Sequence, residues 1–227
     1  MPDPALKGDE AGESEAAEAA PRRDWSGMFR SLVLPLGLLA IILGGLWYWD
    51  ARGGGENSDD ARYGTVELPA ERNATDRSPA AEIGRAAPDF LLETPSGGEL
   101  RLSDLQGQPV LVNFWATWCP PCRAEMPELV AAYGRYRDDG LVIVAVNLQE
   151  ADQKVNEFAD EFGIEFPIVI DRDGELRAVW RLGGPFGGIP SSYFIDASGI
   201  VRSLFYGPMR EPALEERLAE ILEERAG

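Results

Sequence analysis

The chain has two cysteines, Cys119 and Cys122, in the sequence W-C-P-P-C. They directly follow the apolar run 110–116 and precede a pattern of apolar residues with helical spacing. Backbone N–H groups at a helix N-terminus favour a thiolate, and a cysteine three positions later lies one turn further along the helix. The thiolate is the species that attacks disulfides, so this arrangement predicts thiol–disulfide exchange.

Other roles for the cysteine pair fit the sequence less well. A structural disulfide that closes so short a loop stabilises a fold by roughly 2 kcal/mol, against about 4.7 kcal/mol for a loop of 100 residues. Structural zinc needs about four ligands, and the chain has no histidine to add to its two cysteines, which also disfavours a copper-chaperone or haem-ligating role. Two buried bystander thiols would not require this spacing. We therefore expect neither a metal nor a cofactor.

The composition is that of an acidic globular protein with additional segments. Of the 227 residues, 44% are hydrophobic, and the net charge is −18. Such a charge disfavours binding to nucleic acid or to an anionic membrane surface.

Residues 32–49 carry no charged side chain, and their length approaches the roughly 20 apolar residues that a spanning helix needs. The segment ends in Trp47, Tyr48 and Trp49, aromatic residues of the kind that lie at the level of the lipid headgroups. A cleaved signal peptide has a shorter apolar region, of about 7–15 residues, and ends in small residues. We therefore predict a single-pass, uncleaved anchor in an inner (cytoplasmic) membrane.

Charges on the two sides of this anchor predict its orientation and the organisation of the chain. Arginines are slightly more numerous before the anchor than shortly after it, which favours a cytoplasmic N-terminus. Residues 1–31 are rich in Ala, Glu and Asp and are predicted to be a disordered acidic tail. Residues 50–82 are rich in Gly, Ala, Arg and Asp and are predicted to be a flexible linker. One domain, 83–227, follows.

This domain has the pattern of an α/β fold. Segments 89–93 and 99–102 predict a hairpin, and the near-continuous apolar runs 110–116 and 141–148 predict strands that are buried on both faces. Apolar residues at helical spacing predict helices on both sides of the second run and at the C-terminus. A further strand at 166–170 and a second hairpin, 191–195 with 200–205, complete the expected elements.

Four segments carry a resemblance to a known family: 87–90 (A-P-D-F), 102–107 (L-S-D-L-Q-G), 112–127 around the cysteines, and 188–196 (G-I-P-S-S-Y-F-I-D). The domain resembles membrane-anchored thiol–disulfide oxidoreductases of the TlpA/ResA/DsbE type, which are linked to cytochrome c maturation. The resemblance implies a thioredoxin-like fold with an N-terminal β-hairpin and a central αβ insertion, at about 152–170, preceded by a single transmembrane helix.

The resemblance also implies roles for individual residues. Cys119, nearer to solvent, is the expected nucleophile, and Cys122 is the expected resolving thiol. Glu125 occupies the position of a glutamate that does acid–base work in the family, whereas Asn113 replaces the buried aspartate of ordinary thioredoxins. A desolvated carboxyl group would have a raised pKa and could exchange a proton with Cys122. The alternative is a solvated carboxylate that the helix dipole favours.

Three further residues are candidates for substrate binding. Only about 5–6% of X–Pro bonds in folded proteins are cis, so the sequence by itself predicts a trans bond before Pro190. The surrounding motif, however, resembles the family's cis-proline loop, in which the backbone of the preceding residue, here Ile189, contacts the substrate. We expect Trp118 to pack over the edge of the active site and to shape the docking surface, and Trp115 to be a core residue.

These observations together predict a membrane-tethered reductase whose catalytic domain lies in the periplasm or outside the cell membrane. Its expected partners are protein thiol or disulfide clients, such as apocytochrome c, and a membrane electron donor of the thiol-reductant type. A reductase for copper-site or oxidase assembly is an alternative. A peroxiredoxin-like peroxidase fits less well, because that class places a threonine three residues before its cysteine, and Thr117 lies two before Cys119. A non-catalytic docking module is a minor alternative.

Overall fold

The computed structural model describes residues 36–45, 62–184 and 187–223. The chain divides into two units, 1–56 and 57–227. Among the described residues, no helix combines the length and the apolar character needed to cross a membrane. Residues 36–45 are helical, while the rest of the predicted anchor 32–49 and the whole predicted tail 1–31 lie outside the described residues.

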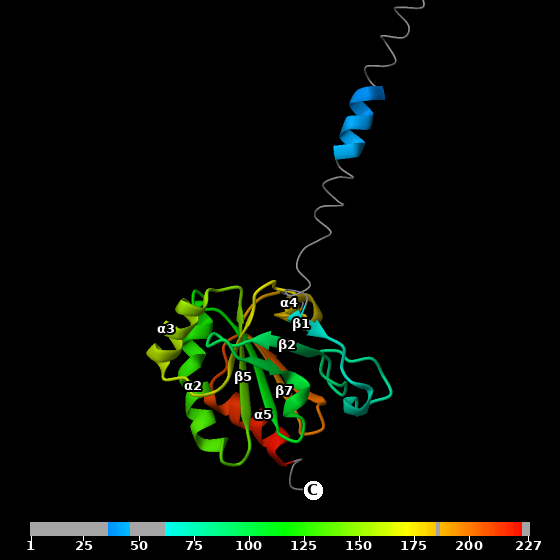
Figure 1. The fold of residues 1–227 in the computed structure, drawn as a ribbon. Coiled ribbons are helices and arrows are strands. Elements are labelled where there is room, and N and C mark those ends of the chain that lie inside the picture. Colours follow the sequence, from blue (N-terminus) through cyan, green and yellow to red (C-terminus); the bar gives the residue numbers. More distant parts are fainter. Residues whose placement is uncertain (1–35, 46–61, 185–186, 224–227) are drawn as a thin grey trace, which may run out of the picture. The chain divides into compact units, whose positions relative to one another are not determined.

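A mixed sheet of eight strands forms the centre of the second unit (Figure 1). Its strands are β1 (Gly64–Val66), β2 (Asp89–Glu93), β3 (Glu99–Arg101), β4 (Val110–Trp115), β5 (Val142–Leu148), β6 (Ile168–Asp171), β7 (Ser191–Ile195) and β8 (Val201–Tyr206). They are ordered β1-β2-β6-β5-β4-β7-β8, and β3 pairs with β2. Strand β4 lies between β5, to which it is parallel, and β7, to which it is antiparallel.

Helices cover both faces of this sheet. The helices are α2 (Pro120–Tyr136), α3 (Asp152–Phe162), α4 (Leu176–Val179) and α5 (Glu211–Glu223), with short 3₁₀ helices η2 (Ala70–Arg72) and η3 (Leu102–Leu105). One apolar core joins α2, α3 and α5 to one face, and a second core joins α4 and η3 to the other. The α/β class, the hairpin β2–β3 and the insertion α3–β6 agree with the sequence-based prediction.

Alternation along β4 determines which side chains lie beneath α2. Leu111 and Trp115 belong to the core under α2, and Val112 and Phe114 belong to the opposite core. Trp115 is fully buried, and its ring centroid lies 4.5 Å from that of Phe158 on α3, so its prediction as a core residue is confirmed. The period of two places Asn113 on the same face as Trp115. A polar amide is thereby buried next to the helix that begins at the cysteines.

The structure differs from the predicted linker over residues 62–82. Strand β1 pairs with β2 in antiparallel register, with Gly64 opposite Leu91. Beyond β1, the Gln106 side-chain amide donates a hydrogen bond to the carbonyl oxygen of Arg72 at 2.6 Å, and the Arg72 guanidinium donates to the carbonyl of Ser103. These long-range contacts hold a polar segment whose strand is too short to show a periodic pattern. The folded unit therefore begins before residue 83.

Candidate active site

The two cysteines lie where β4 passes into α2, as the sequence predicted. Cys119 is the N-cap of α2, and its Sγ accepts a hydrogen bond from the Cys122 backbone N–H at 3.2 Å. Pro120 and Pro121 form the first turn, where a helix has no internal partner for N–H groups. The two sulfur atoms form a disulfide. The helix start thus directs an N–H donor at one sulfur and holds the other within bonding distance.

The cysteines differ slightly in their access to solvent. Cys119 is 3% exposed and Cys122 is 0% exposed. Cys119 is therefore the cysteine nearer to solvent, as predicted, but the difference in exposure is small. The Cys119 Sγ lies 3.9 Å from the carbonyl oxygen of Ile189. The Ile189–Pro190 bond is cis, as the family motif implied and contrary to the expectation from proline statistics alone. The loop before β7 therefore places a backbone acceptor beside the more accessible sulfur.

Trp118 does not pack over the edge of the site in the way that we predicted. Its side chain is 67% exposed, although it directly precedes Cys119. The backbone N–H of the preceding residue, Thr117, donates a hydrogen bond to the Glu150 carboxylate. The backbone next to Trp118 is therefore held in place, while the Trp118 ring remains exposed. The result is an exposed aromatic surface next to the reactive pair.

Glu125, one turn after Cys122 on α2, is fully buried. Its Oε1 accepts a hydrogen bond from Asn113 Nδ2 at 2.8 Å, and its Oε2 accepts one from the backbone N–H of Met209 at 2.9 Å. Burial raises the pKa of this carboxyl group from about 4.5 to about 7, and the two hydrogen bonds oppose part of that rise. The structure therefore agrees with a desolvated group and contradicts the solvated alternative.

Comparisons with known proteins identify the family. The family model described as AhpC/TSA family matches residues 83–204. ResA, a thiol–disulfide oxidoreductase of Geobacillus kaustophilus, is 40% identical over 142 residues, which are 63% of this chain and 79% of that protein. The chain belongs to the AhpC/TSA family. Within this family it is a thiol–disulfide oxidoreductase of the ResA/DsbE type, and Oceanobacillus iheyensis ResA is 37% identical over 66% of this chain and 78% of its own length.

Solved structures support the same assignment. The thiol:disulfide interchange protein of the thioredoxin family from Chlorobium tepidum is 31% identical, with a TM-score of 0.54. The match covers 65% of this chain and 99% of that one. The fold of this ResA/DsbE-type oxidoreductase is therefore thioredoxin-like, as the sequence resemblance implied.

A second carboxylate supports the loop before the cysteines of this oxidoreductase, and sequence analysis missed it. Glu150 accepts hydrogen bonds from the backbone N–H and the hydroxyl of Thr117, at 2.7 and 2.5 Å. The buried Asn147, near the end of β5, donates to the same carboxylate at 2.9 Å. Glu150 is 33 residues from Thr117 along the chain, so no local pattern could have revealed the contact.

Ser191 supports the loop on the other side of the disulfide, and it was also missed. Its hydroxyl accepts a hydrogen bond from the Gly183 N–H at 2.8 Å and donates one to the Gly188 carbonyl at 2.9 Å. A Cβ atom at Gly183 would lie 2.3 Å from the carbonyl carbon of Gly187, so the close approach of the backbone requires glycine there. The Ser191 hydroxyl thus holds the loop that leads to Ile189 at two points, Gly183 and Gly188.

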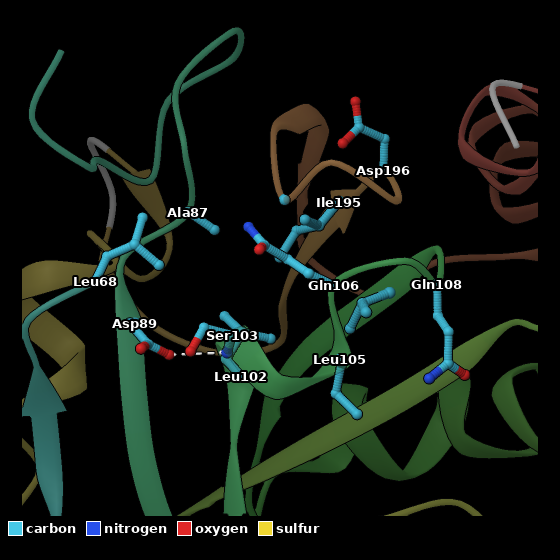
Figure 2. A pocket seen from close by; sticks show the side chains of 12 residues that line it. Leu68, Ala87, Asp89, Leu102, Ser103, Leu105, Gln106, Gln108, Ile195 and Asp196 are labelled. Atoms are coloured by element: carbon cyan, nitrogen blue, oxygen red, sulfur yellow. Dashed lines mark hydrogen bonds between the residues drawn. The ribbon is translucent and has the colours of Figure 1, made fainter. Parts of the chain in front are cut away.

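A small pocket is lined by the side chains that Figure 2 shows from close by. It lies at the start of β4, whereas the cysteines follow the end of that strand. Its lining includes Val110, at the start of β4, and Asp89, whose carboxylate accepts a hydrogen bond from the Ser103 N–H at 2.9 Å. Its volume of about 20 Å³ is that of roughly one water molecule. We do not assign this pocket to the active site.

Buried Glu125 makes the stability of the protein depend on pH. Because its pKa is raised in the folded state, its contribution to stability is complete below about pH 4.5 and is lost as the pH rises through about 7. We compare the unfolding free energy of Glu125→Gln with that of the wild type at each pH. From about pH 4 to about pH 8, this difference is expected to increase by about 3 kcal/mol in favour of the variant. Denaturant unfolding of the oxidised proteins measures this change, and an equal difference at both pH values would contradict it.

Proposed function

We propose that this oxidoreductase reduces disulfides in client proteins through the Cys119–Cys122 pair. One observation carries the proposal: a helix N-terminus holds both sulfur atoms, and a buried carboxyl group with a pKa near 7 lies one turn beyond them. A structural disulfide would need neither this carboxyl group nor an exposed aromatic residue beside it.

In the proposed reaction, Cys119 thiolate attacks one sulfur of the client disulfide and displaces the other as a thiolate. The product is a mixed disulfide between Cys119 and the client. Cys122 then loses its proton and attacks the Cys119 sulfur, so the client leaves with both cysteines reduced. Two electrons have passed from the protein dithiol to the client, and the protein now contains the Cys119–Cys122 disulfide.

Glu125 is the proposed acceptor of the Cys122 proton. Residues three apart on a helix lie on the same face, and both side chains are completely buried, which keeps bulk water from Cys122. A base is most effective when its pKa lies near the working pH, and the pKa of Glu125 is about 7. In the reverse direction, the protonated carboxyl group would protonate Cys122 as the disulfide opens.

Ile189 and Trp118 form the proposed docking surface for the client, and Pro190, which is buried, follows Ile189 in the cis-proline loop. The carbonyl of Ile189 lies beside Cys119 Sγ, where it could accept a hydrogen bond from an extended client chain. Trp118, the residue directly before Cys119, offers exposed apolar contact area. Contacts to backbone and to a single aromatic ring place few demands on the client sequence.

The proposed cellular setting rests on the N-terminal sequence and on the family. The uncharged residues 32–49 support a single-pass anchor in the inner membrane, and the arginine distribution supports a catalytic domain on the periplasmic side. The resemblance to the TlpA/ResA/DsbE type supports a role in cytochrome c maturation, with apocytochrome c as the client, and relatives named ResA and DsbE belong to that type. An oxidising compartment supplies no reductant, so we also propose a membrane electron donor that returns the disulfide to the dithiol.

A Cys122→Ala variant of the full-length chain tests this function. It can form the mixed disulfide but cannot resolve it, so clients are expected to remain covalently attached to Cys119. Mass spectrometry of the adducts then identifies them as apocytochromes, copper-site or oxidase assembly proteins, or other clients. The Cys119→Ala, Cys122→Ala double variant is the matched control. Equal recovery of adducts from both variants would contradict the proposal.

A peroxidase is disfavoured by the position of Thr117. Its hydroxyl donates its hydrogen to the Glu150 carboxylate at 2.5 Å and does not donate it to the Cys119 sulfur. We expect reduced protein to react far more slowly with hydrogen peroxide than with a protein disulfide at the same concentration. Stopped-flow tryptophan fluorescence can follow both reactions, and faster oxidation by peroxide would reverse the assignment.

A further inference from the structure

Asn113, on β4, connects the buried carboxyl group of Glu125 to the strand that follows the cis-proline. Its side chain is completely buried. The Nδ2 atom lies 2.8 Å from Glu125 Oε1 and 3.0 Å from the Ser192 hydroxyl oxygen. Its Oδ1 atom is buried without a hydrogen-bond partner among the described residues. The amide nitrogen of Asn113 therefore donates both of its hydrogens, while its amide oxygen accepts no hydrogen bond from the described residues.

The two oxygen atoms of Glu125 have different kinds of partner. Oε2 faces the backbone N–H of Met209, which can only donate. Oε1 faces a primary amide, which has a donor end and an acceptor end of almost the same size and shape. A proton on Oε2 would therefore point at another proton, whereas a proton on Oε1 can be accommodated if the amide turns over.

We propose that Asn113 is a positioning residue that keeps Glu125 hydrogen-bonded in both of its protonation states. With Glu125 ionised, the NH₂ end of the amide donates to Oε1. With Glu125 protonated on Oε1, the amide turns by half a rotation, and its oxygen accepts the new O–H. This inference rests on the acid–base role proposed above and assigns the residue that holds the carboxyl group while the proton comes and goes.

Ser192 allows this rotation without loss of a second hydrogen bond. A hydroxyl group can accept from the NH₂ end of the amide or donate to its oxygen. The same position of Ser192 therefore serves both orientations of Asn113. An aspartate at position 113 would instead place a second carboxyl group against Glu125, and two adjacent buried carboxylates cannot both ionise readily.

Within the part of the chain that the structure describes, few other titratable or charged groups face Glu125. On α2 these are the thiol of Cys122, when reduced, and Glu128, whose side chain is partly exposed. On the segment before α5, Arg210 follows Met209, but its guanidinium contacts the Ala124 carbonyl and lies 3.9 Å from Glu128. Asn113 on β4 and Ser192 on β7 do not titrate. In the disulfide form, Glu125 is thus the group expected to titrate near pH 7 in this cluster.

The first test uses the wild-type, full-length protein in its oxidised form, where neither cysteine titrates. NMR follows the carboxyl carbon of Glu125 and the side-chain NH₂ signals of Asn113 as the pH is changed. We expect both sets of signals to titrate with one midpoint, near the pKa of about 7. Asn113 signals that stay constant while Glu125 titrates would overturn the proposal, even if thiol exchange itself proceeds normally.

Two variants test the direction of the effect. Asn113→Ala removes a hydrogen bond from both protonation states of Glu125. The hydrogen bond to the ionised carboxyl group is the stronger of the two, so the pKa of Glu125 is expected to rise by about 1 unit. Ser192→Ala, the matched control, keeps both hydrogen bonds to Glu125 and is expected to raise the pKa by less than half as much. An unchanged pKa in Asn113→Ala, or equal shifts in the two variants, would contradict a specific role for Asn113. The wild-type titration decides the question should Asn113→Ala not fold.

Discussion

Replacing Cys119 with serine is expected to reduce disulfide reduction to the rate of the uncatalysed reaction. Cys119 has slight access to solvent, and its sulfur lies 3.9 Å from the Ile189 carbonyl oxygen, whereas Cys122 is completely buried. A hydroxyl group does not ionise near neutral pH and does not attack disulfides. The measurement is the rate at which the reduced, full-length variant reduces a protein disulfide under pseudo-first-order conditions.

Cys122→Ser is the informative comparison for this variant. It retains Cys119 at the helix N-terminus, so a single turnover should yield one equivalent of mixed disulfide and then stop. If Cys122→Ser fails to form the adduct while Cys119→Ser still does, the roles of the two sulfur atoms are reversed. If neither well-folded variant forms an adduct, the nucleophile is not one of these two cysteines.

The second large effect is expected from Glu125→Gln. A positioned acid–base group contributes about 10²- to 10⁴-fold to a rate, so the resolution step by Cys122 should slow by a factor in this range. The first attack, by Cys119, should change much less, because Glu125 lies one turn beyond the buried cysteine. Rapid-quench trapping with an alkylating reagent separates the two steps.

The acid–base role of Glu125 also predicts how the rate of the resolution step changes with pH. The carboxylate is the form that accepts a proton, and it predominates above a pKa of about 7. The rate in the wild type is therefore expected to rise as the pH passes through about 7, and this inflection should be absent in Glu125→Gln. Glu128→Gln, on the same helix but partly exposed, is the matched control and should behave as the wild type does. Identical pH profiles in wild type and Glu125→Gln would exclude the proton-transfer role.

The sequence was sufficient to predict the reactive centre because its determinants are local. The apolar run of β4, the cysteine spacing and the helical pattern of α2 all lie within 30 residues, and each follows from the period of a strand or a helix. Family resemblance added Glu125 and the cis bond before Pro190. Spacing alone left the environment of Glu125 open, and the packing of α2 on the sheet was needed to show that it is buried.

Contacts between distant segments could not be predicted in this way. The Met209 N–H that holds Glu125 lies 84 residues away along the chain, and backbone donors have no signature in the sequence. Similarly, the contact of Glu150 with Thr117 joins the ends of two neighbouring parallel strands. Strand β1 was missed because its three residues lie in a polar segment whose order depends on pairing with β2. In each case tertiary structure, rather than local propensity, determines the position.

The central claim is that Cys119 and Cys122 form a reversible dithiol–disulfide couple. It is tested most directly by equilibrating the full-length protein in a graded series of dithiothreitol redox buffers and trapping free thiols with an alkylating reagent. We predict a single two-electron transition in which both cysteines change together between the disulfide and the doubly alkylated form. A disulfide that persists in fully reducing buffer, or thiols that remain free in fully oxidising buffer, would contradict the account.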